Sequence, residues 1–97
     1  MIDFPKIAAA ALAQIESLIP EWLPNGKRER HEWKSLNPTR ADKKLGSFSV
    51  NLHTGRWGDF ASDDAGNDLI SLYAYLFTNG DQGQAARDVA QRVGVEI

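Results

Sequence analysis

The 97-residue chain has no cysteine, and this absence excludes several classes of protein. Disulfide frameworks, and zinc or iron–sulfur sites held by thiolates, all require cysteine side chains. The chain is therefore not a disulfide-stapled exported mini-protein. A reducing compartment suits a chain without cysteine, so we predict a cytoplasmic location.

Long hydrophobic runs are also absent. The longest apolar run, from Ile7 to Ala13, is far shorter than the roughly 20 apolar residues that a helix needs to span a bilayer. The N-terminus does not combine a basic start with a small-residue cleavage site, which is the pattern of a secretion signal. We therefore predict no membrane partner.

What the chain does contain is the composition of one folded domain. Hydrophobic residues make up 42% of it and charged residues 25%, a balance typical of globular proteins. A chain of this size has room for one core, and no repeat, low-complexity tract or long linker divides it. We therefore predict a single domain over residues 1–97.

The net charge of −2 conceals an uneven distribution of charge along the chain. Residues 27–56 hold eight basic residues against three acidic ones, whereas residues 57–97 hold two basic residues against seven acidic ones. A basic segment can form a local site for a polyanion, because charge acts within a Debye length of roughly 8 Å whatever the total. A solvated loop is the alternative interpretation. The eight basic residues are Lys27, Arg28, Arg30, Lys34, Arg40, Lys43, Lys44 and Arg56.

Three stretches place apolar residues at helical spacing. The first follows the cap residue Asp3, and we expect Pro20 to end it. The second is capped by Asp68, and the third covers residues 81–93, between the cap residue Asp81 and Gly94. The core positions predicted for the first two are Ile7, Ala11, Ile15, Leu18 and Ile19, and then Leu69, Leu72, Tyr73, Leu76 and Phe77.

Strand signals lie between these helices. Residues 47–52 alternate, which turns Phe48, Val50 and Leu52 inward, and residues 56–61 can pair back across a short hairpin loop. Residues 30–34 can form a short strand, and residues 37–46 are expected to be an exposed loop. The sequence thus predicts an α+β fold, with a small antiparallel sheet of two or three strands flanked by an N-terminal helix and two C-terminal helices.

Short motifs follow one another in a definite order along the middle of the chain. They read GSFSVN at residues 46–51, TGRWGDF at residues 54–60 and GNDLISL at residues 66–72. This series resembles the zinc ribbon at the N-terminus of bacterial-type and phage DNA primases. In that family a Ser-Phe-Ser-Val strand, a Gly-x-Trp strand and a Gly-Gly-Asp-x-Ile-Ser helix start occur in the same order.

A second set of motifs narrows the resemblance. It comprises WLPNG at residues 22–26, EW at 32–33, NPTRAD at 37–42 and WGDFA at 57–61. These look like the metal-free variant of the ribbon at the front of primase–helicase proteins of prophages, plasmids and integrated elements. The resemblance covers about residues 20–78 and implies a degenerate, zinc-ribbon-like core, which the helix over residues 81–93 follows.

The chain departs from the family at its metal-binding knuckles. The family's Cys-x-x-Cys knuckle falls where this sequence has Asp59 and Ser62. The other knuckle falls within residues 32–38, where His31 is the nearest imidazole. One carboxylate and one imidazole leave a tetrahedral zinc shell incomplete, so we predict no metal and no other cofactor.

Loss of the metal has an energetic consequence. A structural zinc contributes about 10–16 kcal/mol of binding free energy that is coupled to folding, and another source of stability must replace it. We expect aromatic side chains to gather where the ion would lie. The candidates are Trp33, Trp57, Phe48 and Phe60.

The resemblance implies a module that binds DNA template, single-stranded in that family, for catalytic primase or helicase domains in the same chain or a partner chain. Binders of single strands combine cations that follow the phosphates with aromatic rings on which bases stack. We predict phosphate contacts from the eight basic residues named above. For stacking the candidates are Trp33 and Trp57, and core packing is the alternative for each.

We predict that this chain alone is not an enzyme. The sequence has no evident pairing of a nucleophile with a base, no Gly-x-x-x-x-Gly-Lys loop and no acidic constellation for two metals. Asp63 and Asp64 are interpreted as turn residues. The leading hypothesis is a DNA-binding module of a mobile-element primase. The alternative is a protein-docking module that retains the fold without DNA binding, with its acidic C-terminal helices as the partner surface.

Overall fold

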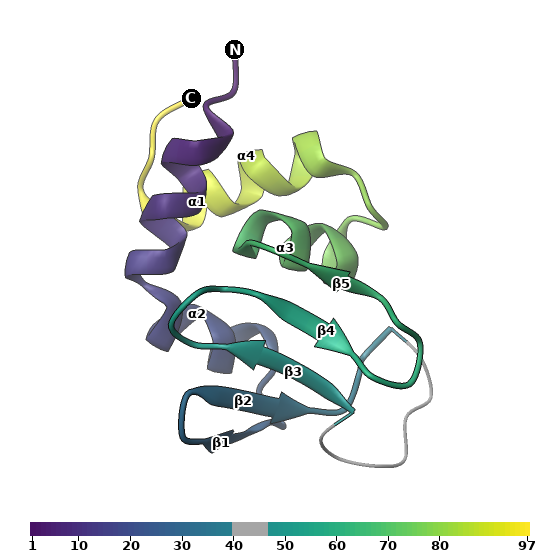
Figure 1. Cartoon of the computed structure of the whole chain (residues 1–97). Helices are drawn as coiled ribbons and strands as arrows, with labels where there is room; N and C mark the ends of the chain where they lie inside the picture. The colour runs from purple at the N-terminus through teal and green to yellow at the C-terminus, as the bar shows by residue number, and fades with distance from the viewer. Residues whose placement is uncertain (40–46) are drawn as a thin grey trace.

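A computed structural model describes residues 1–39 and 47–97 of the chain. The described residues form four helices and a five-stranded sheet (Figure 1). Every neighbouring pair of strands is antiparallel. The elements are, in chain order, α1 (Phe4–Ala13), α2 (Ile15–Trp22), β1 (Lys27–Glu29), β2 (Glu32–Ser35), β3 (Phe48–Asn51), β4 (Trp57–Asp59), β5 (Ala65–Gly66), α3 (Leu69–Phe77) and α4 (Gln82–Val93).

The helices gather on one side of the sheet. In Figure 1, α1, α3 and α4 lie together beyond the β5 edge, and α2 lies behind the strands. None of the described helices covers the face of the sheet that is turned to the viewer. The fold therefore has a buried inner face and an open outer face. None of the helices in the described ranges is long and apolar enough to cross a membrane.

The N-terminal segment forms two helices rather than the one predicted. Asp3 caps α1 as expected, because its carboxylate accepts a hydrogen bond from the Lys6 backbone N–H at 3.1 Å. The chain then bends at Gln14, and Pro20 lies inside α2 instead of ending it. Proline removes one backbone donor, but the helix continues because its apolar side is buried on both sides of Pro20. The buried residues of α2 are Ile15, Leu18, Ile19 and Trp22.

The sheet has five strands, so the prediction of two or three was wrong. The strand predicted over residues 30–34 is a hairpin, in which β1 and β2 are joined at Arg30 and His31. Arg30 has a φ of 56°, the left-handed conformation that allows so tight a turn. Strand order follows chain order from β1 to β5, which makes a simple meander.

The central strand and the C-terminal helices form where they were predicted, but Phe77, which was predicted to be a core residue, is 51% exposed, and Tyr73 and Leu76 are only half-buried. Phe48, Val50 and Leu52 all turn into the core. The Asp68 carboxylate accepts a hydrogen bond from the Ser71 N–H at 2.8 Å and so caps α3. Asp81 caps α4 through the Gln84 N–H at 3.0 Å, and α4 ends at Gly94, which has a φ of 83°.

The aromatic cluster differs from the one predicted. Phe48 and Trp57 do pack together, with ring centroids 5.8 Å apart, and Tyr75 of α3 completes the cluster at 4.8 Å from Trp57. Phe60 is 78% exposed, and Trp33 is only half-buried, against the edge of the core. Two of the four expected members therefore lie elsewhere, because strand alternation turns Phe60 away from the side that holds Trp57.

Candidate nucleic-acid interface

The register of the strands defines which side chains share the open side of the sheet. Residues opposite one another in an antiparallel pair point to the same face, and alternate residues of a strand follow them. We call this surface the outer face. Its described members include Lys27, Glu29, Glu32, Lys34, Ser49, Asn51, Arg56, Gly58, Phe60 and Ala65.

The structure divides the predicted phosphate-binding residues. Lys27, Lys34 and Arg56 lie on the outer face, and the Lys34 ammonium is 5.9 Å from the centroid of the Phe60 ring. At this distance the cation is attracted to the face of the ring. Phe60 is the one large aromatic side chain that this part of the described structure presents to solvent, and Arg56 lines the same hollow as Phe60 while Lys27 lies opposite Lys34.

The other predicted cations do not join this group in the described structure. Arg28 points to the opposite side, where its guanidinium pairs with Glu16 of α2. Arg30 is exposed in the turn between β1 and β2. The remaining three predicted cations are Arg40, Lys43 and Lys44, and they lie outside the described residues. Of the eight cations, the described structure thus brings three together.

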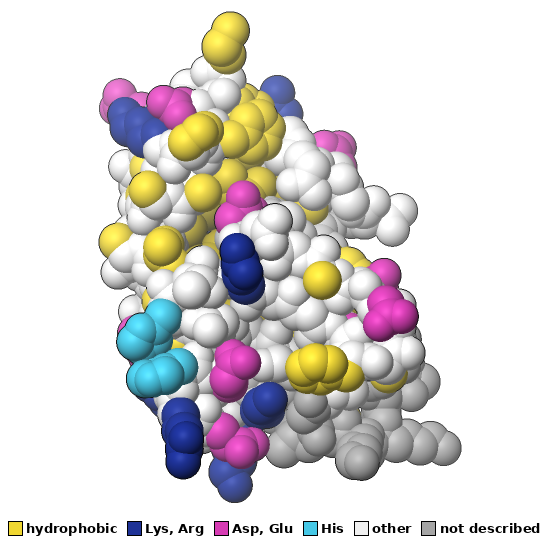
Figure 2. Space-filling view, viewed as in Figure 1, with side chains coloured by type: hydrophobic (Ala, Val, Ile, Leu, Met, Phe, Trp, Pro, Cys, Tyr) yellow, Lys and Arg dark blue, Asp and Glu magenta, His cyan; other side chains and the backbone are white. Residues whose placement is uncertain are grey.

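Acidic side chains interrupt the positive charge of the outer face. Glu29 and Glu32 are opposite one another on β1 and β2, and each lies two residues from the cation of its own strand, Lys27 or Lys34. Figure 2 shows this mixture, with basic, acidic and apolar side chains interleaved over the sheet in the lower half of the view. The face is therefore not a uniform phosphate-binding surface, and aromatic and polar contacts must contribute to any binding there.

The two tryptophans predicted to stack on bases have structural contacts instead. Trp57 is 7% exposed, and its indole N–H donates to the Ser71 hydroxyl at 3.0 Å. Trp33 donates to the Leu23 carbonyl at 3.0 Å, and its indole occupies the space that a side chain at Gly26 would need. The stacking role is thus wrong for Trp57, whose ring is packed in the core. Trp33, which is half-buried and points to the side of Leu23, does not belong to the outer face.

Phe60 was predicted to pack inside, where the family's metal ion would lie, but it is the exposed aromatic residue of the outer face. A usable signal was present, because Trp57 faces inward and a residue three positions later on the same extended strand faces outward. We predicted instead that Phe60 would lie inward, where the family's metal ion would be, and this prediction disregarded the alternation of the strand. The observed backbone hydrogen bond from the Phe60 N–H to the Ser47 carbonyl, at 2.9 Å, keeps the alternation going beyond β4.

A hollow of about 270 Å³ lies in the outer face beside Phe60. Glu32, Ser49, Asn51 and Arg56 supply its polar walls. The Asn51 side-chain oxygen is already engaged, because it accepts the backbone N–H groups of the following turn at 2.8 and 3.0 Å. By contrast, Glu32 Oε2 and Ser49 Oγ are buried and have no hydrogen-bond partner within the described part of the chain.

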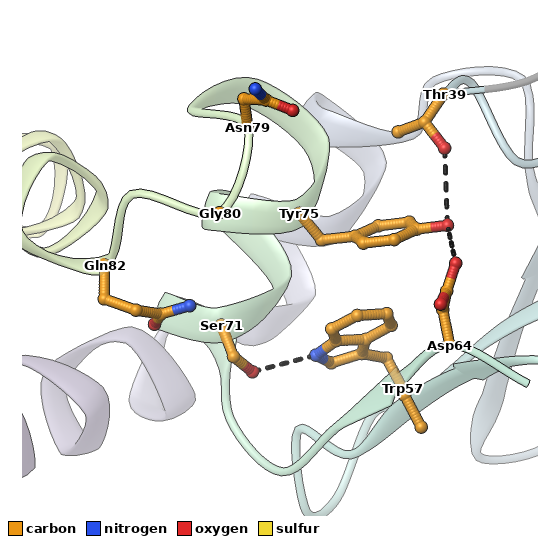
Figure 3. A pocket seen from close by; sticks show the side chains of 9 residues that line it. Thr39, Trp57, Asp64, Ser71, Tyr75, Asn79, Gly80 and Gln82 are labelled. Carbon is orange, nitrogen blue, oxygen red and sulfur yellow. Dashed lines mark hydrogen bonds between the residues drawn. The ribbon is translucent and has the colours of Figure 1, made fainter.

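A larger cavity of about 470 Å³ lies on the helix side, between β4, β5 and the start of α4 (Figure 3). Its aromatic floor is Trp57 and Tyr75. The polar groups drawn there are mostly paired with one another: the Tyr75 hydroxyl donates to Asp64 at 2.8 Å, and Trp57 donates to Ser71. This arrangement ties α3 to the sheet, so we interpret the cavity as structural.

The two segments in which the resemblance implied metal-binding knuckles do lie side by side. Asn37, which was predicted to be exposed, is 1% exposed and donates to the Asp59 carboxylate at 2.6 Å and to the Tyr75 hydroxyl at 2.8 Å. Asp59 also accepts the Ala61 N–H at 2.8 Å. Over residues 1–39 and 47–97, no group of three or more His, Asp or Glu side chains could hold a metal ion. A buried hydrogen-bond network joins the two segments.

The two histidines lie together at one end of the sheet. The rings of His31 and His53 are 4.0 Å apart and meet edge to face, as the paired cyan side chains in Figure 2 show. They belong to the β1–β2 turn and the β3–β4 loop. Neither residue lines the hollow beside Phe60. No local sequence pattern marks this pairing, because the two residues are 22 positions apart in the chain.

Three groups on the helix side have shifted pKa values. A hydrogen bond from Arg92 of α4 lowers the pKa of the Glu21 carboxyl on α2, and the same contact raises the pKa of Arg92. Burial raises the pKa of Tyr73, and the charge of Asp88 adds to the effect. The contact between Arg92 and Glu21 is bidentate, with distances of 2.8 to 3.2 Å. These groups bridge helices and lie away from the outer face.

A scan against protein-family models and a search of curated proteins found no match to this chain. The function is therefore argued from the geometry of the outer face and from the resemblance in sequence.

Proposed function

We propose that the chain is a non-catalytic module that binds single-stranded nucleic acid through its outer face. The observation that carries the proposal is the exposed Phe60 ring, which lies on the open side of the sheet beneath the Lys34 ammonium. Proteins that bind single strands stack bases on such rings and hold the adjoining phosphates with cations. Lys27, opposite Lys34 on β1, and Arg56, which directly precedes β4, extend the cationic contact along the outer face.

Single strands suit this surface better than duplex DNA. A duplex is held mainly by many phosphate contacts, whereas the described outer face offers three cations and two carboxylates. An unpaired base, by contrast, can lay its face on a single exposed ring, and each such stack contributes about 1–3 kcal/mol. The resemblance to primase ribbons makes template DNA the strand we propose, and catalytic primase or helicase domains its working partners.

The proposal predicts a shallow salt dependence. Each single-strand phosphate contact contributes about 0.7 log units of affinity per log unit of salt, so three contacts give a slope of about −2. Titration of the chain with a labelled mixed-sequence 12-mer of single-stranded DNA, followed by fluorescence anisotropy at several salt concentrations, measures both affinity and slope. Binding no tighter than millimolar at low salt would contradict the proposal and favour the protein-docking alternative.

The decisive variant is Phe60→Ala. Loss of one base stack should weaken binding about 5- to 150-fold. Phe77→Ala is the matched control, since Phe77 is a half-exposed aromatic residue on α3. It should leave DNA affinity unchanged. Equal losses for the two variants would show that general surface hydrophobicity, rather than the outer face, holds the strand.

A further inference from the structure

The hollow beside Phe60 contains two polar atoms that the described fold leaves unsatisfied. Glu32 Oε2 and Ser49 Oγ are shielded from solvent, and neither finds a hydrogen-bond partner among residues 1–39 and 47–97. Ser49 as a whole is 6% exposed. Burial of an unpaired polar group destabilises a fold, and such groups in native structures call for an explanation. A ligand that donates hydrogen bonds would supply one.

The two atoms belong to one site. Glu32 is opposite Asn51, and Ser49 is opposite Lys34, so the carboxylate and the hydroxyl are diagonal neighbours on β2 and β3 and point to the same face. Both line the hollow, with Phe60 and Arg56 beside them. The site therefore combines acceptors, an aromatic surface and a cation.

Gly58 leaves the floor of this site clear. It is opposite Ser49 and also lines the hollow. A Cβ added at Gly58 would meet its nearest atoms at 3.6 and 3.7 Å, which is ordinary van der Waals contact. Packing within the described fold thus does not require glycine there. A flat ligand could lie against the exposed backbone at this point.

We propose that the hollow takes one nucleobase of the bound strand and that it prefers guanine. This inference rests on the proposed function and assigns a base to the same surface. An ionised carboxylate only accepts hydrogen bonds. Guanine offers two donors side by side, N1–H and the N2 amino group, which match the two oxygens of Glu32. The Ser49 hydroxyl can donate to O6, the neighbouring acceptor on the same edge.

The other bases fit these acceptors less well. Adenine and cytosine each present one amino group next to a ring nitrogen that only accepts, and that nitrogen would face the carboxylate without a proton. Thymine presents one N–H between two carbonyl oxygens, which the carboxylate repels. Phe60 provides stacking for any base, and Arg56 can hold a flanking phosphate. The discrimination therefore comes from Glu32 and Ser49, and the base-independent affinity comes from Phe60 and the cations.

The test uses single-stranded oligothymidylate 9-mers that carry one central guanine, hypoxanthine, adenine or cytosine, with the all-thymine strand as reference. Binding to the full chain is measured by fluorescence anisotropy. The guanine strand should bind about tenfold or more tightly than the adenine, cytosine and all-thymine strands. Hypoxanthine lacks the N2 amino group, so its strand should lie between guanine and the rest.

Glu32→Gln should abolish the preference for guanine, because an amide presents one donor and one acceptor where guanine needs two acceptors. Glu29→Gln is the matched control. It removes the same charge from the same face, directly opposite Glu32, but Glu29 does not line the hollow. This control should retain the preference, and both variants should bind the all-thymine strand at least as tightly as the parent does.

Each outcome bears on a definite claim. Equal affinity of the parent for all five strands, with sensitivity to Phe60→Ala intact, would overturn the guanine site and leave the proposed function standing. Retention of the preference in Glu32→Gln, or its loss in both glutamine variants, would also overturn the site. Absence of binding to every strand would overturn the proposed function and this inference with it.

Discussion

The two faces of the sheet differ in whether their buried polar groups are hydrogen-bonded. On the helix side, the Trp57 indole donates to Ser71, and the buried Asn37 amide donates to Asp59 and Tyr75. On the outer face, two buried oxygens lack partners in the described chain, and a phenylalanine lies in solvent. Trp57 and Asp59 of the first set and Glu32 and Ser49 of the second belong to strands of the same sheet, so the contrast lies between its two faces.

This difference separates what stabilises the domain from what is available for binding. Paired and packed groups lower the free energy of the folded state relative to the unfolded state, whereas unpaired buried groups raise it and exposed rings change it little. The outer face carries the second kind within one hollow. A 97-residue fold without disulfides has little stability to spare, so buried groups that destabilise it are best explained by a ligand they meet.

The largest expected effect separates the faces by stability. Trp57→Ala removes a large buried side chain next to Phe48 and Tyr75, and should lower the free energy of unfolding by about 3–5 kcal/mol. A domain of this size would then be largely unfolded. Phe60→Ala, the control from the outer face, should unfold at the parent's urea midpoint. A Trp57→Ala variant that folds normally but loses DNA binding would contradict the division between the faces.

A smaller loss is expected from Asn37→Ala. The variant deprives the buried Asp59 carboxylate of one of its donors and also removes a donor to Tyr75, which should cost about 1–3 kcal/mol. Urea unfolding monitored by circular dichroism measures the change. Asn67→Ala, at an exposed asparagine before α3, is the control and should be nearly neutral. Equal stability of the two variants would show that the hydrogen bonds of Asn37 to Asp59 and Tyr75 do not stabilise the fold.

On the outer face, replacement of a buried polar residue by alanine should raise the free energy of unfolding rather than lower it. Ser49→Ala deletes a buried hydroxyl that has no partner in the described chain, so the desolvation cost disappears without loss of a hydrogen bond. We expect a gain in stability of up to about 1 kcal/mol by urea unfolding, together with weaker discrimination for guanine. A clear loss of stability would mean that the hydroxyl has a structural role, and it would weaken the contrast between the faces.

Local chemistry explains which parts of the fold the sequence predicts well. Asp68, Asp81 and Gly94 act on their own helix ends, through contacts three or four residues away, and they predict correctly where α3 and α4 start and where α4 ends. The central strand is equally clear, because its alternation is driven by burial. The strands β1 and β5 have no such signal, since their side chains are exposed or small.

The buried network and the candidate site were harder to predict, because both depend on pairing between distant segments. Asn37 meets Asp59 and Tyr75 across 22 and 38 residues, and no local pattern marks that contact. The basic residues of 27–34 are close in sequence, yet strand alternation sends Arg28 to one side and Lys27 and Lys34 to the other. The strand register, rather than the density of positive charge, determines which of them share a surface.

The smallest effect is expected where paired groups are exposed. Arg92 lowers the pKa of Glu21 below its ordinary value of 4.5, so the folded state gains stability from the ionised carboxylate above that pH and loses it as pH falls through the lowered pKa. Glu21→Gln should therefore be slightly less stable than the parent at pH 7, and the gap should narrow as the pH falls below 4.5 toward pH 3. Urea midpoints at the two pH values measure it, with the exposed Glu96→Gln as control. A gap that persists at pH 3 would show that the side chain contributes through packing of α2 on α4 rather than through its charge.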